Sequence, residues 1–278
     1  MIIVEEISEK VFKHISDLIY QEIGVHLPQK KKAMVNSRLS KRIRKLGLQD
    51  FESYCQYLEN NKQELLHLFN TLTTNVTHFF REKHHFDFLC DNVLPQVKNE
   101  RAGKKVRVRG WSPGCSSGEE AYTLAILLSE FFNQSWDTKI LATDINTEVL
   151  NAAQSGIYHK RQVKKVPYEL LTKYFQLGTG ENKGLFKIKS KLKKLVQFRR
   201  SNLNQNQYPI KSKLDFIFCR NVFIYFNDKT QNKILNRFHK HLKPGGYLFL
   251  GHSESINTEE REDKWESVYK TVYQKRRR

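Results

Sequence analysis

The turn between a predicted strand and the helix after it carries the first residues whose types favour ligand chemistry. Residues 106–112 (VRVRGWS) predict a strand, residues 112–118 (SPGCSSG) a turn, and residues 119–132 a helix. Glycines let the backbone approach a ligand, and the start of a helix offers free N–H groups to an anionic or dipolar one. Glu119 and Glu120 stand in the first helical turn, where they can bind an amino group of that ligand or complement the helix dipole.

Asp144 follows the next predicted strand, residues 139–143. An acid at that position is placed to accept hydrogen bonds from ribose hydroxyls. The glycines of the preceding turn are Gly110, Gly114 and Gly118, a spacing that differs from the G-x-G-x-x-G of dinucleotide sites. The pattern therefore favours an adenosine ligand without a pyrophosphate, and S-adenosylmethionine (SAM) is such a ligand.

A third group of polar residues follows a strongly apolar stretch, residues 214–219 (LDFIFC). This stretch predicts a central strand that is covered on both faces. It leads into Arg220, Asn221 and Tyr225. Because ligands of a parallel sheet bind at the carboxyl ends of its strands, we expect the glycine turn, Asp144 and these three residues to meet in one crevice.

The elements that must position these residues alternate between strand and helix in the second half of the chain. Further predicted elements there are a helix over residues 228–242, a strand over 247–251 and an edge strand over 265–275. Before residue 90, apolar residues recur with helical spacing over 7–19, 34–46, 51–59 and 64–72. The predicted fold class is therefore α/β, with an all-α domain ahead of a mostly parallel sheet.

Composition excludes several classes of protein. With 39% hydrophobic residues, the 278-residue chain is neither disordered nor collagenous. No apolar run approaches the ~20 residues of a membrane span. The N-terminus is acidic where a signal peptide is basic, so a soluble, cytoplasmic protein is expected. The four cysteines lie tens of residues apart, which fits neither a zinc site nor a disulfide scaffold, and we expect no metal.

Motifs along nearly the whole chain resemble the chemotaxis receptor glutamate methyltransferases, the CheR family. They are TTNVTHFFR (residues 73–81), SSGEE (116–120), ATDIN (142–146), GIY (156–158), FCRNVFIYF (218–226), LKPGG (242–246) and GHSES (251–255). In this order the set is highly specific, although no single motif would suffice.

The resemblance implies the domain organisation. It predicts a helical receptor-docking domain over residues 1–90, a linker over 91–104, and a class I SAM-dependent methyltransferase domain, Rossmann-like, over 105–278. It also predicts a small antiparallel β insert. We place this insert at about residues 157–200, where turn glycines separate short alternating segments.

The resemblance also implies the site. The cofactor is SAM and its product is S-adenosylhomocysteine (SAH). The residues expected to hold the cofactor are Asn75, Thr77, Arg81, Gly114, a glutamate that is Glu120 in preference to Glu119, Asp144, Asn202, Leu203, Arg220 and Asn221.

The reaction implied is methyl transfer to a glutamate carboxylate of a receptor. A carboxylate with a pKa of about 4.3 is already ionised near pH 7, so no general base is required. We expect Arg81 and Tyr225 to be the catalytic residues. The planar fork of arginine can bind one carboxylate oxygen and the tyrosine hydroxyl can fix the angle of approach.

Charge indicates the partners. The chain has 48 Lys and Arg against 29 Asp and Glu, a net charge of +19. In this family the receptor methylation helices are acidic, so we expect docking on a basic helix through Lys31, Lys32, Arg38, Lys41, Arg42, Arg44 and Lys45. The predicted insert is also strongly basic. In some family members it binds a receptor C-terminal peptide, and the sequence leaves open whether this one does.

Two alternatives remain at this point. The basic charge also fits an RNA or DNA methyltransferase. Base N-methylation commonly uses an Asn/Asp-Pro-Pro-Tyr/Phe loop after the central strand, whereas this chain has RNVFIY over residues 220–225, and we therefore expect no nucleic-acid partner. A signalling adaptor without turnover is the other alternative, and the intact Arg81, Asp144, Asn221 and Tyr225 disfavour it.

Overall fold

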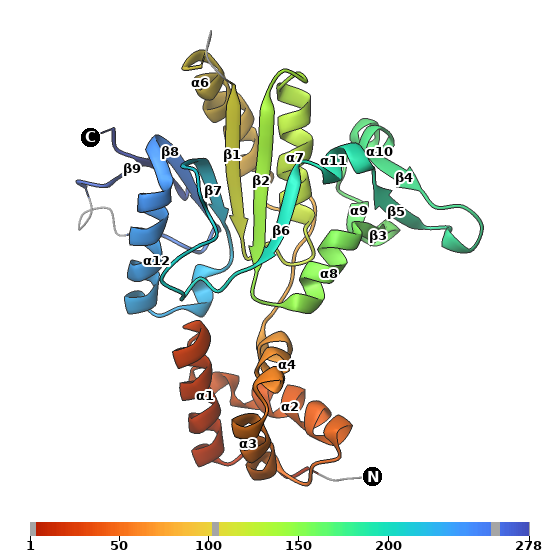
Figure 1. The fold of residues 1–278 in the computed structure, drawn as a ribbon, viewed down its shortest axis with the longest axis vertical. Coiled ribbons are helices and arrows are strands. Elements are labelled where there is room, and N and C mark those ends of the chain that lie inside the picture. The colour runs from red at the N-terminus through yellow and green to blue at the C-terminus, as the bar shows by residue number, and fades with distance from the viewer. Residues whose placement is uncertain (1–3, 102–105, 257–261, 278) are drawn as a thin grey trace.

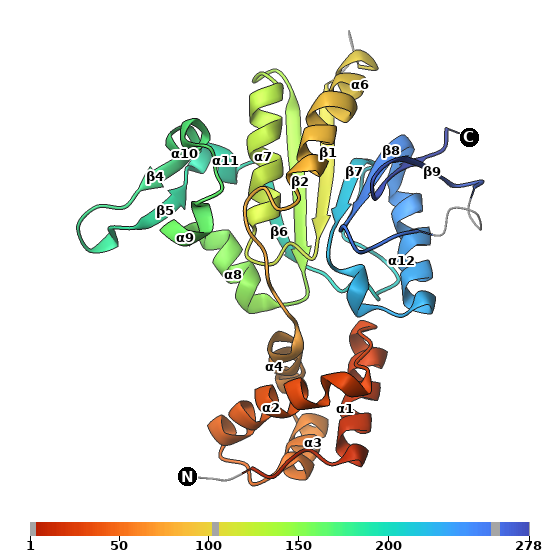
Figure 2. The same cartoon turned by 180° about the vertical axis from the view of Figure 1, so that it is seen from behind.

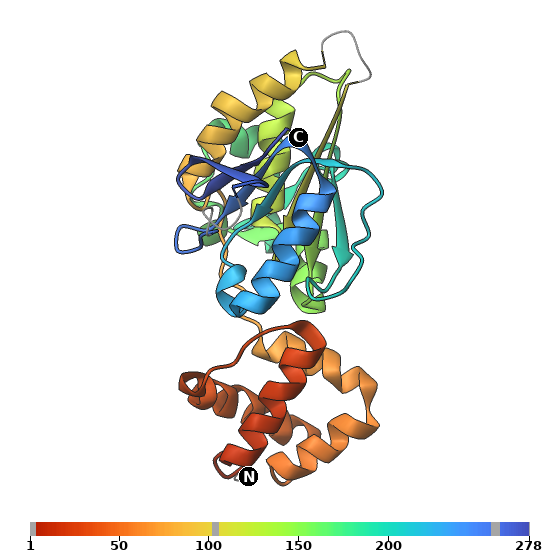
Figure 3. The same ribbon diagram turned by 90° about the vertical axis from the view of Figure 1, so that its left-hand side faces the viewer.

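Two lobes are stacked along the longest axis of the molecule in the computed structural model, which describes residues 4–101, 106–256 and 262–277 (Figures 1 and 3). The smaller lobe is helical and contains the N-terminus. The larger lobe is built around a twisted sheet.

The helical lobe is the bundle that the hydrophobic spacing predicts. The Ser8 hydroxyl caps its first helix by accepting the Val11 N–H, and Gly24 ends that helix in the left-handed conformation. Asp50 begins the third helix with a capping box that it shares with Ser53. The main helices are α1 (Glu9–Ile23), α2 (Lys32–Leu46), α3 (Phe51–Asn60) and α4 (Lys62–Leu72), with the short η1 (Gln29–Lys31) ahead of α2.

The large lobe holds one mixed sheet, in which seven strands of the described residues pair in the order β6-β2-β1-β7-β8-β10-β9. Neighbours from β6 to β8 run parallel, and β10 and β9 add an antiparallel edge. The strands are β1 (Arg107–Pro113), β2 (Asp137–Asp144), β6 (Val196–Arg200), β7 (Leu214–Cys219), β8 (Leu242–Leu250), β9 (Trp265–Tyr269) and β10 (Val272–Lys275).

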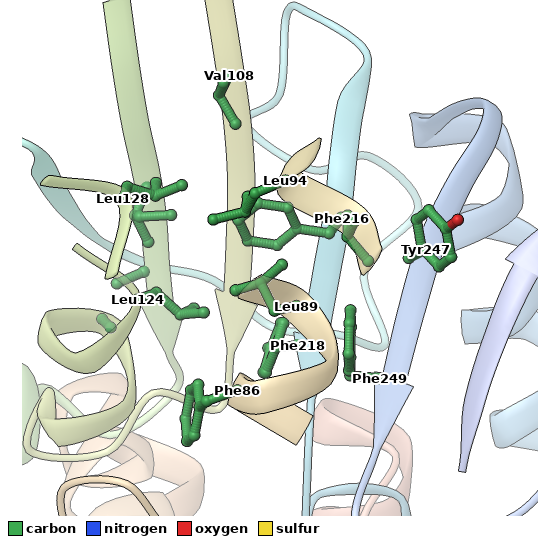
Figure 4. Packing of buried hydrophobic residues seen from close by; sticks show 14 of the residues in the cluster. Phe86, Leu89, Leu94, Val108, Leu124, Leu128, Phe216, Phe218, Tyr247 and Phe249 are labelled. Carbon is green, nitrogen blue, oxygen red and sulfur yellow. The ribbon is translucent and has the colours of Figure 1, made fainter. Parts of the chain in front are cut away.

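Helices cover both faces of this sheet. On the face seen in Figure 2, α6 and α7 pack through Leu94 and Leu124 against Val108 and Phe218, and Figure 4 shows this core. On the other face, Phe238 of α12 packs edge-on against Trp111. The helices of this lobe are α5 (Lys83–Phe88), η2 (Leu89–Val93), α6 (Leu94–Asn99), α7 (Glu119–Phe131), α8 (Thr147–Ser155), η4 (Phe223–Tyr225) and α12 (Asp228–His241).

The boundary between the lobes differs from the predicted one. Leu89 and Leu94 are fully buried in the core of the sheet, so residues 83–99 belong to the large lobe rather than to a helical domain ending at 90 and a linker over 91–104. The core of the helical lobe ends at Leu72. The spacing of apolar residues reports that a helix has a buried face, but it does not report which core buries it. Residues 102–105 of the predicted linker lie outside the described residues.

The insert in the structure is shorter than the predicted range, residues 157–200. Three short strands of the described residues form a separate antiparallel sheet in the order β3-β5-β4, which projects beside the main sheet (Figure 1). The last strand assigned to the insert, β6, instead pairs parallel with β2, for example Phe198 opposite Ala142. The elements of the insert are β3 (Ile157–His159), α9 (Lys160–Val163), α10 (Tyr168–Tyr174), β4 (Phe175–Leu177), η3 (Gly180–Asn182), β5 (Leu185–Ile188) and α11 (Ser190–Lys193).

The architecture confirms the predicted fold class: an all-α domain, a mostly parallel α/β sheet and a small antiparallel insert. Among the helices described here, none is both long and apolar enough to cross a membrane.

Candidate active site

A cavity of about 510 Å³ opens between the carboxyl ends of the parallel strands and the helical lobe. Strands β6, β2, β1 and β7 all end at its wall, and α1 contributes Ile19 and Ile23 from the opposite side. The predicted site residues that line the cavity are Asn75, Thr77, Arg81, Gly114, Glu120, Asp144, Asn202, Leu203, Arg220, Asn221 and Tyr225. Glu119 does not line it.

The two glutamates at the start of α7 point to different surroundings. Successive helical side chains diverge by about 100° because the helix has 3.6 residues per turn. Glu120 faces the cavity, where its Oε1 accepts a hydrogen bond from Ser112 Oγ at 2.7 Å. Glu119 instead faces the insert and accepts hydrogen bonds from Ser117 Oγ at 2.7 Å and Gln162 Nε2 at 3.1 Å. Burial raises the pKa of both carboxyl groups.

The turn before α7 brings backbone to the cavity wall. Gly114 has φ +70, and a Cβ there would lie 2.4 Å from Val222 Cγ2, so only glycine fits between the two loops. Two residues later, the Ser116 amide donates to Asp144 Oδ2 at 2.8 Å. Asp144 Oδ1 accepts the Asn146 amide at 2.9 Å, and burial raises the pKa of the Asp144 carboxyl group. Each oxygen keeps a lone pair for a ligand in the cavity.

Arg220 is the buried cation of the site. Its guanidinium lies over the rings of Phe86 and Phe218, with centroid distances of 5.1 and 5.9 Å. Its Nε is 3.5 Å from Glu120 Oε2, and its Nη2 donates to the Arg81 carbonyl oxygen. Within the described residues, Nε and Nη1 have no hydrogen-bond acceptor. A buried guanidinium with free donors at a cavity wall suits an anionic ligand group.

Arg81 and Tyr225 are anchored to the same extended segment. Arg81 Nη1 donates to the Val76 carbonyl oxygen at 2.8 Å, and the Tyr225 hydroxyl donates to the Thr74 carbonyl oxygen at 3.3 Å. Burial raises the pKa of the Tyr225 hydroxyl, which therefore stays protonated at neutral pH. The two predicted catalytic side chains thus reach one cavity from elements far apart in the chain.

The remaining predicted residues complete the wall and connect the lobes. The Asn75 carbonyl oxygen accepts Ser116 Oγ at 3.3 Å, so this segment contacts the glycine turn. Asn202 and Leu203 follow β6, and Asn202 Nδ2 donates to the Glu22 carbonyl oxygen of α1 at 2.7 Å. Thr77 also lies at the cavity wall.

Sequence reasoning missed two groups of residues. The first is the helical-lobe wall, including Ile19 and Ile23, because these residues read only as the core of a helix. The second is a pair of acids behind the wall. Glu82 follows Arg81 directly and Glu254 lies in the GHSES motif, and those positions were the signal that could have found them. His78 also lines the cavity, and its Nε2 lies 3.2 Å from Lys165 Nζ of the insert.

Comparison with known proteins gives the family. The model described as "CheR methyltransferase, SAM binding domain" matches residues 75–273, and that described as "CheR methyltransferase, all-alpha domain" matches residues 10–73. The chemotaxis protein methyltransferase of Escherichia coli is 43% identical, over 92% of this chain and 87% of its own. That of Borreliella burgdorferi is 39% identical, over 90% and 89%. Chemotaxis protein methyltransferase 2 of Pseudomonas aeruginosa is 40% identical, over 88% and 86%.

These names give no support to the alternative of an RNA or DNA methyltransferase, and the cavity fits SAM on its own chemistry. The free donors of buried Arg220 suit the carboxylate of the amino-acid end, and Glu120 beside them suits its amino group. Asp144 stands at the tip of β2, the position that suits a ribose. The chain therefore belongs to the CheR methyltransferase family and is a SAM-dependent methyltransferase.

Proposed function

We propose that this enzyme transfers a methyl group from SAM to the side-chain carboxylate of a glutamate in a chemotaxis receptor. The observation that carries the proposal is that Arg81 and Tyr225 are both anchored to the Thr74–Val76 segment, in the wall of a cavity that also holds Glu120 and Arg220. The names of the relatives support a receptor as the acceptor.

The acceptor needs positioning rather than activation. When bound, SAM would supply a methyl group on a positively charged sulfur. The leaving group of the transfer is neutral SAH. A glutamate carboxylate is ionised near pH 7, so its oxygen attacks with its own electron pair and no proton moves. Correct orientation alone can supply roughly 7–11 kcal/mol of the barrier reduction.

Arg81 and Tyr225 are suited to that positioning. Arginine has five N–H donors, and Arg81 gives one to Val76, which leaves donors for one oxygen of the acceptor carboxylate. Tyr225 keeps its proton because burial raises the pKa of its hydroxyl group, so it can donate to the same carboxylate. One acceptor oxygen is then held and the other stays free to attack.

The other end of the cavity holds the cofactor in this proposal. Arg220 binds the carboxylate of SAM, Glu120 its amino group and Asp144 its ribose hydroxyls. Glu119 is not part of this proposal, because its carboxylate is bound to Gln162 and Ser117. The residues that complete the contact surface are Asn75, Thr77, Gly114, Asn202, Leu203 and Asn221.

Receptor docking is proposed on α2, with fewer residues than the sequence predicted. Arg42 is bound to buried Glu64 at 2.8 and 2.6 Å, and Arg38 donates to the carbonyl oxygens of Thr71 and Thr73, so both are structural. Lys32 is paired with Glu9. The exposed bases that remain for an acidic receptor helix are Lys31, at the end of η1, and Lys41, Arg44 and Lys45 of α2.

The insert is the proposed site for a receptor C-terminal peptide. Its sheet has the order β3-β5-β4 within the described residues, so β3 and β4 are edge strands. An edge strand can pair with an extended peptide through backbone hydrogen bonds. Tethering of this kind would raise the effective concentration of receptor without changing the chemistry. A cytoplasmic location, where receptor methylation helices would be reached, belongs to the same proposal.

The test is a labelling experiment. Purified protein and methyl-labelled SAM are incubated together in separate reactions, each with one acceptor: receptor-containing membranes, bulk RNA or DNA. We expect label on receptor protein that is released by mild base, as a carboxyl ester is, and no label on nucleic acid. Label on nucleic acid, or no label on receptor from protein that binds SAH, would overturn the proposal.

A further inference from the structure

Glu82 lies directly behind the site, next to Arg81 in the chain. Its backbone has φ +53, a left-handed conformation that is uncommon for a residue other than glycine. Its side chain is only 12% exposed, yet it is not among the residues that line the cavity. Residues that their surroundings hold in an uncommon backbone conformation are frequent at functional sites.

The carboxylate of Glu82 contacts two residues that do line the cavity. Its Oε1 accepts a hydrogen bond from Asn221 Nδ2 at 3.4 Å, and its Oε2 is 3.7 Å from Arg220 Nε. Arg220 and Asn221 are adjacent residues at the end of β7, so one carboxylate spans both of them. Asn221 itself has φ +59, the left-handed conformation that asparagine adopts more readily than most residues.

Two histidines flank this carboxylate from other elements. His85 of α5 is buried, with Nδ1 3.4 Å from Glu82 Oε2, and burial lowers its pKa to about 4, so it is neutral at pH 7. His252, after β8, is 61% exposed on its side chain and has Nδ1 2.9 Å from Glu82 Oε1. Buried His85 therefore adds no positive charge at neutral pH, and within the described residues Arg220 is the arginine that faces Glu82.

Arg220 thus lies between two carboxylates with different properties. Glu120 faces the cavity, and burial raises its pKa. Burial acts in the same direction on Glu82, but the His252 contact and the Arg220 charge outweigh it, and the pKa of Glu82 is lowered. Glu82 is therefore the carboxylate that stays ionised behind Arg220, which leaves Glu120 free for a cationic group in the cavity.

We infer that Glu82 is a positioning residue for the cofactor. It holds the Arg220 guanidinium and the Asn221 amide in place at the cavity wall, and it supplies the counter-charge that keeps Glu120 available. The inference rests on the cofactor contacts proposed for Arg220 and Asn221, and not on the identity of the methyl acceptor.

The test is calorimetric titration of the whole protein with SAH, compared between wild type and Glu82→Gln. The amide has a similar shape but lacks the charge, and it can turn its NH₂ group toward Asn221. We expect the Kd for SAH to rise about tenfold, the size of effect that loss of a charged hydrogen-bond partner gives. In receptor assays, the KM for SAM should rise while the KM for receptor stays the same.

Controls separate this role from a general loss of structure. Asp87→Asn changes an exposed acid of α5, the helix that follows Glu82, and should bind SAH as the wild type does; within the described residues its ion pair is with Lys83. Glu82→Asp keeps the charge and should recover part of the affinity. If Glu82→Gln fails to fold by circular dichroism, Glu82→Asp carries the test, with a Kd above that of the wild type expected.

A wild-type Kd in every folded Glu82 variant would overturn the inference, and so would an equal rise in KM for receptor and SAM. Because SAH binding is measured without an acceptor, failure of receptor methylation would leave this test intact.

Discussion

The carboxylate of Glu254 accepts the backbone N–H of Asn221 at 2.8 Å and thereby fixes the loop after β7. The same carboxylate accepts the amides of Gly251 at 2.6 Å and Ile224 at 3.3 Å. Glu254 is only 4% exposed. One buried acid therefore sets the path of a loop that carries Arg220 and Asn221 at its start and Tyr225 at its end.

Glu254→Gln should weaken this loop. A carboxamide has one acceptor oxygen, so at least one of the three amides would face an NH₂ donor instead of an acceptor. We expect the free energy of unfolding to fall by about 1–3 kcal/mol, measured as a lower Tm, with weaker SAH binding. Glu266→Gln, a change at an exposed site, is the control. An unchanged Tm in Glu254→Gln would show that the loop does not depend on this carboxylate.

Tyr225→Phe tests acceptor positioning. The ring stays and only the hydroxyl is lost, so SAH binding should be unchanged, while kcat should fall about tenfold, as expected for one hydrogen bond lost in the transition state. Steady-state kinetics at saturating SAM and receptor measure the effect. Tyr168→Phe, on the exposed insert surface, should have wild-type kcat. Full turnover of Tyr225→Phe would contradict the role given to the hydroxyl.

Glu119→Gln and Glu120→Gln should behave differently. Glu120 lines the cavity beside Arg220, whereas Glu119 is bound to Gln162 of the insert. We expect Glu120→Gln to raise the Kd for SAH by roughly tenfold or more, the cost of losing a charged partner. The change in log Kd caused by Glu119→Gln should be less than half of the change caused by Glu120→Gln. Equal effects in calorimetry would mean that the two acids do not divide their roles in this way.

Cofactor binding should also depend on pH through Glu120. Burial raises its pKa above the ordinary value of 4.5, and an amino group binds the ionised form. Affinity for SAH should therefore fall as pH drops through the raised pKa, beginning above pH 4.5. The contribution of Glu120 to folding stability changes with pH in the opposite direction. The folded protein holds this proton more tightly than the unfolded chain, so the stabilisation from Glu120 is present below pH 4.5 and lost as pH rises through the raised pKa. Calorimetry from pH 5 to 8 should give a flatter profile for Glu120→Gln.

The exposed bases of α2 should act on receptor binding alone. The triple change Lys41→Glu, Arg44→Glu and Lys45→Glu should raise the KM for receptor about tenfold at low salt and leave the Kd for SAH unchanged, because exposed charges act mainly through screened, long-range attraction. The wild-type KM should rise with added salt. A receptor KM that is flat across salt concentrations would argue against docking on this helix.

Arg42→Ala, in the same helix, is the contrasting variant. It leaves the carboxylate of Glu64, only 2% exposed on its side chain, without its arginine. Removing one partner of a buried pair costs about 3–5 kcal/mol, so a large fall in Tm is expected rather than a specific effect on receptor. A wild-type Tm would mean that Arg42 is not structural and belongs with the docking residues.

The fold was largely predictable because each strand and helix carries its own local pattern. The apolar stretch before Arg220 forms central strand β7, and the helical spacing over residues 51–59 forms α3. What local pattern could not supply was the partner of each element. Leu89 and Leu94 lie in the range predicted for the helical domain and its linker but pack on the sheet, and β6 lies in the range predicted for the insert but pairs parallel with β2.

The candidate site was predictable where motif residues sit at strand ends, as Asp144 and Arg220 do. The residues alone did not separate Glu119 from Glu120, and only the family resemblance favoured Glu120, because the two side chains differ by a rotation of about 100° around one helix. Docking on α2 shows the same limit. A basic residue such as Arg42 is exposed or buried according to whether an acid such as Glu64 lies opposite, and that depends on the packing of two helices.

The two segments of the chain that match the family models meet at the wall of the cavity. One ends at residue 73 and the other begins at 75. Across this seam the His26 amide donates to the Tyr225 carbonyl oxygen at 2.8 Å, Val25 pairs with Phe226, and Asn202 bonds to Glu22. The helical lobe is therefore not an interchangeable module. A chimaera that takes its first 73 residues from a relative would replace one wall of the cavity and the contacts that join it to the loop after β7.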